Sequence, residues 1–412
     1  MEISTYILYI ILGILLLNYA FEQYLEFLNG KNRSLELPEK AREIYNEDEY
    51  KKSQQYESDK QRLSFVSGTF SIILIVLFIL MDGFAYVDQW ARQVTNNPLI
   101  IPLIFFAILF LAMDIVQLPF SIYGTFVIEE KYGFNKYSPK LFISDKLKGY
   151  LLTAIIGGGL MLLIVWFYQQ TGPWFWVYAW GLITVFMLFM TMFYSHLIVP
   201  LFNKLTPLEE GELKSSIVDF SKKAGFQLDN IFVMDGSKRS TKANAFFSGL
   251  GKKKRIVLFD TLIQEMKKHE VVAVLAHEIG HYKKRHTLVS VILSILQTGL
   301  TLYILSIFID YPVFSEALGL EQHSFHVGLI TFSLLYSPIS TILGIGMNAI
   351  SRKNEYAADH FAKVHFSGES LIEALKKLSV KNLSNLTPHP AYVFVHYSHP
   401  PLLERIETLQ NK

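Results

Sequence analysis

A five-residue segment, His277-Glu278-Ile279-Gly280-His281, has the residue types and the spacing of a metal site. Residues i and i+4 of a helix lie on one face, so His277 and His281 can both bind a single Zn²⁺ ion. Glu278 lies between them, where it can act as a general base and take a proton from the attacking water. The alternative is a pair of surface histidines on an amphipathic helix. The apolar residues Val271 to Leu275, just before the motif, favour the metal site.

A second segment can supply the third protein ligand that a catalytic zinc site needs beside its open position. The chain has no cysteine, so any metal must be bound by His, Asp or Glu. After the last long apolar run, Asn354-Glu355-Tyr356-Ala357-Ala358-Asp359 places carboxylates at i and i+4 of a predicted helix. We expect Glu355 to bind the ion and Asp359 to accept a hydrogen bond from a ligating imidazole, which fixes its tautomer. Alone, this segment would indicate only an exposed acidic helix face; the two-histidine motif favours the ligand.

The remaining histidines show no such spacing. His269 and His286 belong to the predicted motif helix, but at eight residues before His277 and five after His281 they are not obvious ligands. The others have no partner at ligand spacing and are interpreted as ordinary core or surface residues: His196, His323, His326, His360, His365, His389 and His396.

The motif requires a helix and a scaffold beside it, and residues 205–287 predict both. The motif helix is expected over about His269 to Arg285. Thr206-Pro207 is expected to begin an earlier amphipathic helix that ends at Gly225. Short apolar runs between turn residues predict the strands of a small sheet: Asn230 to Met234, Ala243 to Leu250 and Ile256 to Phe259.

Composition indicates that most of the chain lies in a membrane. Of the 412 residues, 51% are hydrophobic and only 18% are charged. This balance excludes disorder and is too apolar for an ordinary soluble protein of this length. Seven apolar runs reach the length of about 17 to 25 residues that crosses a hydrocarbon core of roughly 30 Å: Ile3 to Ala20, Phe65 to Met81, Leu99 to Phe120, Tyr150 to Phe167, Trp174 to Leu197, Leu288 to Phe308 and Val327 to Ile350.

Basic residues are confined to alternate loops, which predicts the orientation. Residues 21–64, 121–149, 198–287 and 351–412 hold 37 of the 38 Lys and Arg residues, and only Arg92 lies elsewhere. Because basic loops are retained in the cytoplasm, the N-terminus is expected outside and the metal site on the cytoplasmic side. The formal net charge of +2 gives no overall field that would attract nucleic acid.

These patterns divide the chain into four parts. Membrane helices 1–5 with their loops occupy residues 1–200, and the cytoplasmic catalytic segment occupies residues 201–287. Membrane helices 6 and 7 follow at 288–350, and residues 351–412 form a cytoplasmic C-terminal segment that completes the metal site.

Several stretches together resemble the type I CAAX prenyl proteases, multi-pass zinc metallopeptidases also called a-factor-converting enzymes. Besides the two segments above, three stretches carry a resemblance that runs nearly from end to end: Leu118-Pro119-Phe120 through Glu129-Glu130-Lys131-Tyr132-Gly133-Phe134-Asn135, Asn244-Ala245-Phe246-Phe247 through Asp260-Thr261-Leu262, and Ser398-His399-Pro400-Pro401 through Glu404-Arg405-Ile406. The resemblance implies a mainly α-helical polytopic membrane protein with about seven transmembrane helices that enclose a water-filled chamber. It adds a small α+β zincin-like catalytic unit on the cytoplasmic side.

The resemblance also implies residue roles, a cofactor and a substrate. Asn244 and His399 are expected near the substrate or the developing oxyanion, and Arg405 is expected to support that site. Without the resemblance, Asn244 would be interpreted as a strand-edge residue and His399 as a turn residue before Pro400. The implied cofactor is one Zn²⁺ ion, and the implied substrate is a prenylated peptide or protein cut near its C-terminus. We expect the strand from Asn244 to Gly249 to bind that peptide as an added strand.

Polar residues within the apolar runs bear on the predicted chamber. Asp82, Asp114 and Gln117 lie at or inside membrane runs, where polar groups are best tolerated beside water or a polar partner. As single acids, Asp82 and Asp114 fit a structural role at least as well. Together with the resemblance, they favour helices that serve as chamber walls as well as anchors.

Two other functions remain open from the sequence. A membrane quality-control protease of the HtpX type shares the zinc motif, but it is a shorter chain with fewer spans. A transporter or scaffold could hold a structural or regulatory metal, and would lack both an open coordination position and peptide cleavage. The oligomeric state is not determined by the sequence.

Overall fold

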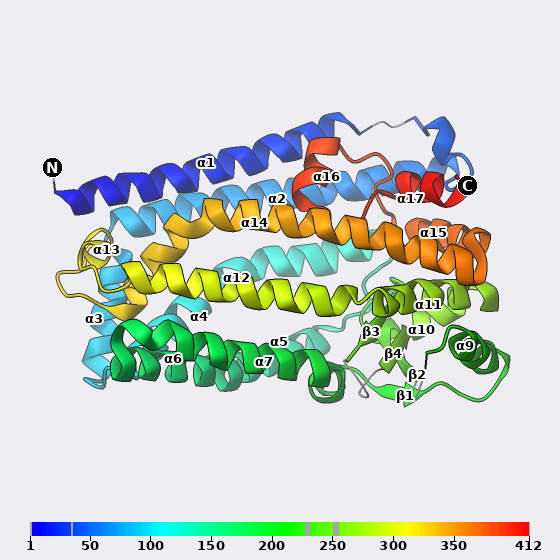
Figure 1. Ribbon diagram of the computed structural model, residues 1–412. Helices are drawn as coiled ribbons and strands as arrows, with labels where there is room; N and C mark the ends of the chain where they lie inside the picture. Colours follow the sequence, from blue (N-terminus) through cyan, green and yellow to red (C-terminus); the bar gives the residue numbers. More distant parts are fainter. Residues whose placement is uncertain (1, 34–35, 227–230, 250–254, 412) are drawn as a thin grey trace.

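The computed structural model describes the whole chain except residues 1, 34–35, 227–230, 250–254 and 412. Long helices lie side by side along most of its length, and a small sheet with shorter helices lies at one end of them (Figure 1). The N-terminus lies at the opposite end, near α13, and the C-terminus lies at the end that holds the sheet. The fold therefore has two ends joined by long helices.

The elements of the N-terminal half are mostly long helices: α1 (Ile3–Lys31), η1 (Glu39–Ala41), α2 (Glu47–Leu80), α3 (Gly83–Val94), α4 (Ile101–Tyr123), η2 (Gly124–Glu129), α5 (Pro139–Leu152), η3 (Thr153–Gly157), α6 (Gly158–Thr171), η4 (Gly172–Trp174), α7 (Phe175–Leu197) and α8 (Val199–Phe202). The C-terminal half contains β1 (Leu205–Pro207), α9 (Glu212–Lys223), β2 (Ile231–Met234), η5 (Gly236–Lys238), β3 (Ala245–Ser248), β4 (Arg255–Phe259), α10 (Asp260–Glu265), α11 (Lys268–Lys283), α12 (His286–Phe308), α13 (Val313–Glu316), α14 (Phe325–Ala362), η6 (Lys363–Ser367), α15 (Gly368–Asn382), α16 (Pro390–His396) and α17 (Leu402–Gln410).

Among the described residues, six helical stretches are long and apolar enough to cross a membrane. One of them, Pro139–Phe202, contains two of the predicted runs. A short turn at Gly172–Trp174 separates α6 from α7 there, and Gly172 has a φ of 53°, a conformation that glycine adopts readily. The predicted apolar runs thus lie on long helices, and the predicted helical fold class is confirmed.

The small sheet supports the helix that carries the two-histidine motif. In the described part of the chain it has four strands in the order β1-β2-β4-β3. β2 and β4 are parallel, while β1 and β3 pair with them in antiparallel fashion. Ile256 and Leu258 of β4 share a buried core with Val271 and Leu275 of α11, so one face of the sheet fixes α11 by apolar packing.

Local boundaries differ from the sequence prediction in two places. The expected helix start at Thr206-Pro207 is wrong: both residues lie in β1, and α9 begins at Glu212. Proline fits either position, because an edge strand and the first turn of a helix both leave backbone N–H groups unpaired. The motif helix ends at Lys283, before the predicted Arg285.

The remaining strand predictions fall on β2, β3 and β4. Two of the predicted end residues, Asn230 and Leu250, lie outside the described residues.

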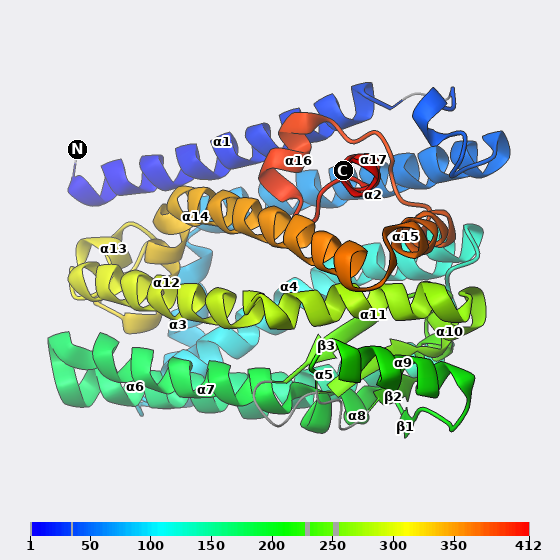
Figure 2. The same ribbon diagram turned by 45° about the vertical axis from the view of Figure 1, so that its right-hand side comes forward.

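α14 connects the two ends of the molecule. Its 38 residues begin beside α13, at the end away from the sheet, and finish against α11 (Figures 1 and 2). The C-terminal half of α14 carries Glu355 and Asp359, so a single helix brings these carboxylates from the membrane part of the fold to the motif helix.

Candidate active site

Two histidines of α11 face the same point. The Nε2 atoms of His277 and His281 lie 3.1 Å apart, as the i, i+4 spacing predicts. His277 is buried, and the side chain of His281 is 21% exposed. α11 packs against the sheet and the helices α14 and α15, and ten of its sixteen residues are buried, so the histidines are held on a well-packed element.

Gly280 allows α14 to approach this part of α11. A Cβ atom at position 280 would lie 3.1 Å from the Cα and carbonyl oxygen of Ala358 and from the Cβ of Phe361. Two of these are backbone atoms that cannot rotate away. The glycine between the histidines therefore permits the close contact that brings Glu355 to the motif.

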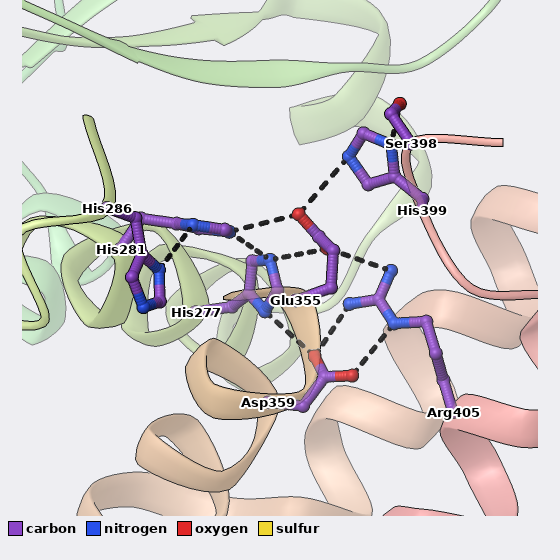
Figure 3. Close-up of polar contacts among 8 residues, drawn as sticks. All are labelled: His277, His281, His286, Glu355, Asp359, Ser398, His399 and Arg405. Carbon is purple, nitrogen blue, oxygen red and sulfur yellow. Dashed lines mark hydrogen bonds and ion pairs between the residues drawn. The ribbon is translucent and has the colours of Figure 1, made fainter. Parts of the chain in front are cut away.

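Glu355 bridges the two histidines. Its Oε2 lies 3.3 Å from Nε2 of His277, and its Oε1 lies 3.2 Å from Nε2 of His281 (Figure 3). The carboxylate is buried, with 5% of the side chain exposed. Two imidazole nitrogens and a carboxylate thus converge from two different helices.

This donor set fits a metal ion. One ligand atom from each of His277, His281 and Glu355 lies within 4.8 Å of the others. The separations of 3.1 to 3.3 Å match the edge of a tetrahedron around a zinc ion, about 3.3 Å for bonds of about 2.0–2.1 Å. Unless a cation or a proton lies between them, lone pairs of nitrogen and oxygen face one another in this buried site.

Asp359 and Arg405 form a second layer behind His277. Asp359 Oδ1 lies 2.8 Å from Nδ1 of His277. The guanidinium of Arg405, on α17, donates from Nε to Oδ2 at 2.8 Å and from Nη2 to Oδ1 at 2.6 Å. All three side chains are buried. Asp359 thus lies beside a motif histidine, and Arg405 balances the charge of that carboxylate.

His399 approaches Glu355 from the exposed side of the cluster. Its Nε2 lies 3.3 Å from Oε1 of Glu355, and its Nδ1 lies 3.0 Å from the hydroxyl of Ser398 (Figure 3). The His399 side chain is 65% exposed. An exposed imidazole beside a buried ligand set is placed to meet a substrate.

Two further predicted residues form no hydrogen bond or ion pair with the cluster among the described residues. Glu278 follows His277 on α11, and burial of its carboxyl group raises its pKa. Asn244 is exposed and directly precedes β3, where its side-chain oxygen accepts the N–H of Ala245 at 2.8 Å. Asn244 is thus at the edge of the sheet, as its sequence position indicates.

One contact of the motif is not predicted by the sequence. His286 Nδ1 lies 3.0 Å from Nδ1 of His281, on the side of the ring away from Glu355. The helix breaks at Arg285, which has a φ of 59°, and α12 begins at His286. A continuous helix would have turned His286 away, and no Gly or Pro signals the break. His269 instead pairs with Glu373 at 3.1 Å.

Comparisons with known proteins agree along the full length. Residues 27–204 match the family model of the CAAX prenyl protease N-terminal region with five membrane helices, and residues 207–412 match that of peptidase family M48. A CAAX prenyl protease 1 homolog of Oryza sativa is 36% identical over 97% of this chain and 96% of its own length. CAAX prenyl protease 1 of Saccharomyces cerevisiae is also 36% identical, over 97% of this chain and 94% of its own.

A solved structure agrees as well. The crystal structure of S. mikatae Ste24p superposes with a TM-score of 0.94 at 34% sequence identity, and the match covers 98% of this chain and 99% of that one. The prediction of a CAAX-type membrane protease is confirmed, and neither the HtpX-type alternative nor the scaffold receives support. The chain therefore belongs to the CAAX prenyl proteases of peptidase family M48, which are integral membrane metallopeptidases.

Proposed function

We propose that this metallopeptidase uses one Zn²⁺ ion, held by His277, His281 and Glu355, to cut a peptide bond near the C-terminus of a prenylated CAAX-type peptide or protein. The observation that carries the metal assignment is the convergence of three ligand atoms from two helices at tetrahedral-edge distances. The names of the full-length relatives support the substrate class. Three protein ligands leave the fourth position of a tetrahedral zinc ion open for water or substrate.

The ion and Glu278 have different roles in the proposed reaction. When bound, the ion supplies Lewis-acid polarisation of the scissile carbonyl and makes the attacking water more acidic. Glu278 takes the proton of that water and then gives a proton to the leaving amine. Its raised pKa suits this exchange, because a carboxyl group that is less acidic than usual can both accept and return a proton near neutral pH.

The second layer keeps the ligands in one arrangement. The carboxylate of Asp359, 2.8 Å from Nδ1 of His277, favours the tautomer with the proton on Nδ1, which leaves Nε2 free to face the ion. Arg405 keeps Asp359 ionised by a bidentate ion pair. His399 lies within reach of the substrate beside Glu355, and Asn244 lies at the edge strand where the peptide enters. We assign both to stabilisation of the developing oxyanion.

β3 is the proposed binding strand for the substrate. It lies at the edge of the sheet, and among the described residues no strand pairs with its other side. Phe247 of β3 packs against Tyr282, the residue after His281, so the strand lies alongside the motif helix. An extended peptide can add to such an edge by main-chain hydrogen bonds. Proline scanning of the substrate tests this, because unchanged turnover with proline at every flanking position would exclude strand addition.

The orientation of the chain and the water-filled chamber also belong to this proposal. The metal cluster lies at the end of the molecule where the basic loops gather, which supports a cytoplasmic catalytic side and an N-terminus outside. Only 6 to 17% of the most apolar window of each spanning stretch is buried within the protein. Asp114 and Lys146, in two such stretches, pair at 2.7 Å and remain 24% and 23% exposed. The carboxylate of Asp114 lies inside a predicted membrane run, where a charged group is tolerated beside water or a paired cation, and this supports a hydrated interior.

The test is cleavage by the purified protein of matched farnesylated and unmodified C-terminal peptides, with the products identified by mass. The proposal predicts a single cut near the C-terminus and a clear preference for the farnesylated peptide. Equal cleavage of both would remove the prenyl group from the proposed substrate. Absence of cleavage in zinc-loaded protein would refute the proposed function.

A further inference from the structure

The guanidinium group of Arg352, on α14, lies at the C-terminal end of α16, the short helix that precedes His399. Nη1 of Arg352 lies 2.6 Å from the carbonyl oxygen of Tyr397, 3.2 Å from that of Val393 and 3.4 Å from that of Phe394. These carbonyls belong to the last turn of α16 and to the residue after it. The C-terminal end of a helix presents carbonyl oxygens that lack donors, and a positive charge is favourable there.

A second side chain of α14 holds the same turn. Asn348 lies one turn before Arg352 and donates from Nδ2 to the carbonyl oxygen of Val395 at 2.7 Å. Residues at i and i+4 share a helix face, so the two side chains act together on the end of α16. We refer to Asn348 and Arg352 as the α16 clamp.

The loop that carries His399 is fixed to α14 at both of its ends. Before the loop, the α16 clamp holds Tyr397; after it, Arg405 of α17 holds Asp359 with two hydrogen bonds. The clamp residue Arg352 and Asp359 are seven residues apart on α14, about 10 Å along the axis, and Glu355 lies between them.

Within this loop the backbone is stiff. Pro400 and Pro401 follow His399 directly, and a proline restricts both its own φ and the conformation of the residue before it. With few free torsions between its two fixed ends, the loop can hold His399 at its 3.3 Å distance from Glu355 although the side chain is largely exposed.

We infer that Asn348 and Arg352 are positioning residues that place His399 over the reacting peptide bond. This inference rests on the role of His399 in the proposed function. α14 then determines the position of a metal ligand and of the substrate-facing imidazole at once. A shift of the imidazole by about 1 Å is enough to cost roughly a hundredfold in rate, so a clamp remote from the substrate has a measurable effect.

The test is a double-mutant cycle on peptide cleavage with Arg352→Met, His399→Gln and the combined variant. We expect Arg352→Met to lower kcat by about ten- to a hundredfold with little change in KM or in bound zinc. In the His399→Gln background the same substitution should have almost no further effect, because the residue it positions is gone. Arg352→Lys should recover part of the activity by restoring a cation beside Tyr397. Lys353→Met, an exposed neighbour on α14, is the matched control.

A spectroscopic readout separates positioning from activity. The chain has no cysteine, so Phe394→Cys, at an exposed position of α16, can carry a single nitroxide label. Arg352→Met should increase the mobility of that label, and Lys353→Met should not.

Each outcome decides a different point. If the losses of kcat from Arg352→Met and His399→Gln multiply in the double variant, the inference is overturned and the proposed function is intact. The same holds if Arg352→Met leaves the spectrum of the label unchanged. Full activity of His399→Gln would overturn both the inference and the role of His399. If the wild type cleaves no peptide, the proposed function fails, and the label spectrum still shows whether the clamp holds α16.

Discussion

The two ends of the molecule contain the same triad of side chains with different surroundings. At the catalytic end, His277 contacts Asp359 at 2.8 Å, and Asp359 is held by Arg405. At the opposite end, Nε2 of His326 contacts Asp88 at 2.6 Å, and Arg92 donates to Asp88 at 2.7 Å. Asp359 and His326 lie near opposite ends of α14, so one helix carries a member of each triad.

The two triads differ in the groups that surround each imidazole on the side away from its aspartate. Beyond His277 are a second histidine and Glu355, arranged around a point that a cation can occupy. Beyond His326, Nδ1 is buried without a hydrogen-bond partner among the described residues, and the ring packs 4.5 Å from that of Phe105. A His–Asp–Arg triad around a buried His–Asp pair is therefore not a metal site by itself. Metal chemistry requires further ligands on the open side of the ring.

The largest expected difference between the ends comes from removing each histidine. His277→Ala should reduce bound zinc to background and peptide cleavage by at least about a thousandfold, because it removes a ligand. His326→Ala should leave zinc and cleavage close to wild type and should lower the thermal unfolding midpoint. Elemental analysis, cleavage assays and thermal unfolding of both purified variants check this. Loss of zinc from His326→Ala would show that the two ends are not independent.

Removing the carboxylate of each triad gives the next largest difference. Asp359→Asn should weaken zinc binding by about ten- to a hundredfold, because a partner of a ligating histidine sets its tautomer and basicity. Asp88→Asn should not change zinc affinity, but it should lower the free energy of unfolding by roughly 1 to 3 kcal/mol through a weakened buried hydrogen bond. Competition with a chelator measures the affinities. Equal zinc affinities in the two variants would contradict the role of Asp359.

A glycine at each end provides a test of packing. At Gly280 a new Cβ would lie 3.1 Å from backbone atoms of Ala358, whereas at Gly328 it would lie 3.2 Å from the side-chain Cδ1 of Ile309, which can rotate. Gly280→Ala should separate α11 from α14 by a few tenths of an ångström and lower zinc affinity, at a packing cost of about 1 to 3 kcal/mol. Gly328→Ala should bind zinc like the wild type. A zinc affinity of Gly280→Ala equal to that of Gly328→Ala would exclude this role of the glycine.

The smallest predicted effect is the release of a proton when zinc binds. In the metal-free protein, burial lowers the pKa of His277, but the neighbouring carboxylates of Asp359 and Glu355 outweigh burial and raise it to about 9. Below pH 9 the ring is therefore protonated, and zinc must displace that proton. Zinc binding should release about one proton near pH 7, and zinc affinity should rise with pH and level off above about 9. Calorimetry in buffers of different ionisation enthalpy measures the release; none at pH 7 would contradict the assignment.

Local spacing was enough to predict much of the site. His277 and His281 share a face because a helix has 3.6 residues per turn, and the same rule placed Glu355 and Asp359 on one side of a second helix. The apolar runs were equally readable, because a membrane requires long uninterrupted hydrophobic helices. These features depend on residues that are close in sequence.

Contacts that depend on a helix break or on segments far apart in the sequence could not be predicted from the residues. His286 reaches His281 only because α11 breaks at Arg285, a residue that rarely adopts a positive φ. The approach of His399 to Glu355 spans 44 residues and depends on how α16 and α17 are fixed to α14, so only the family resemblance suggested it. Thr206-Pro207 was assigned to a helix because proline suits a first helical turn as well as an edge strand.

The most direct test of the account is peptide cleavage by Glu278→Gln, with zinc measured in the same preparation. If His277, His281 and Glu355 hold the ion and Glu278 moves the proton, this variant should retain one zinc per chain. Its cleavage of a farnesylated C-terminal peptide should be lower than wild type by about 10²- to 10⁴-fold. Near wild-type cleavage by zinc-loaded Glu278→Gln would contradict the assignment of the general base and, with it, the central claim.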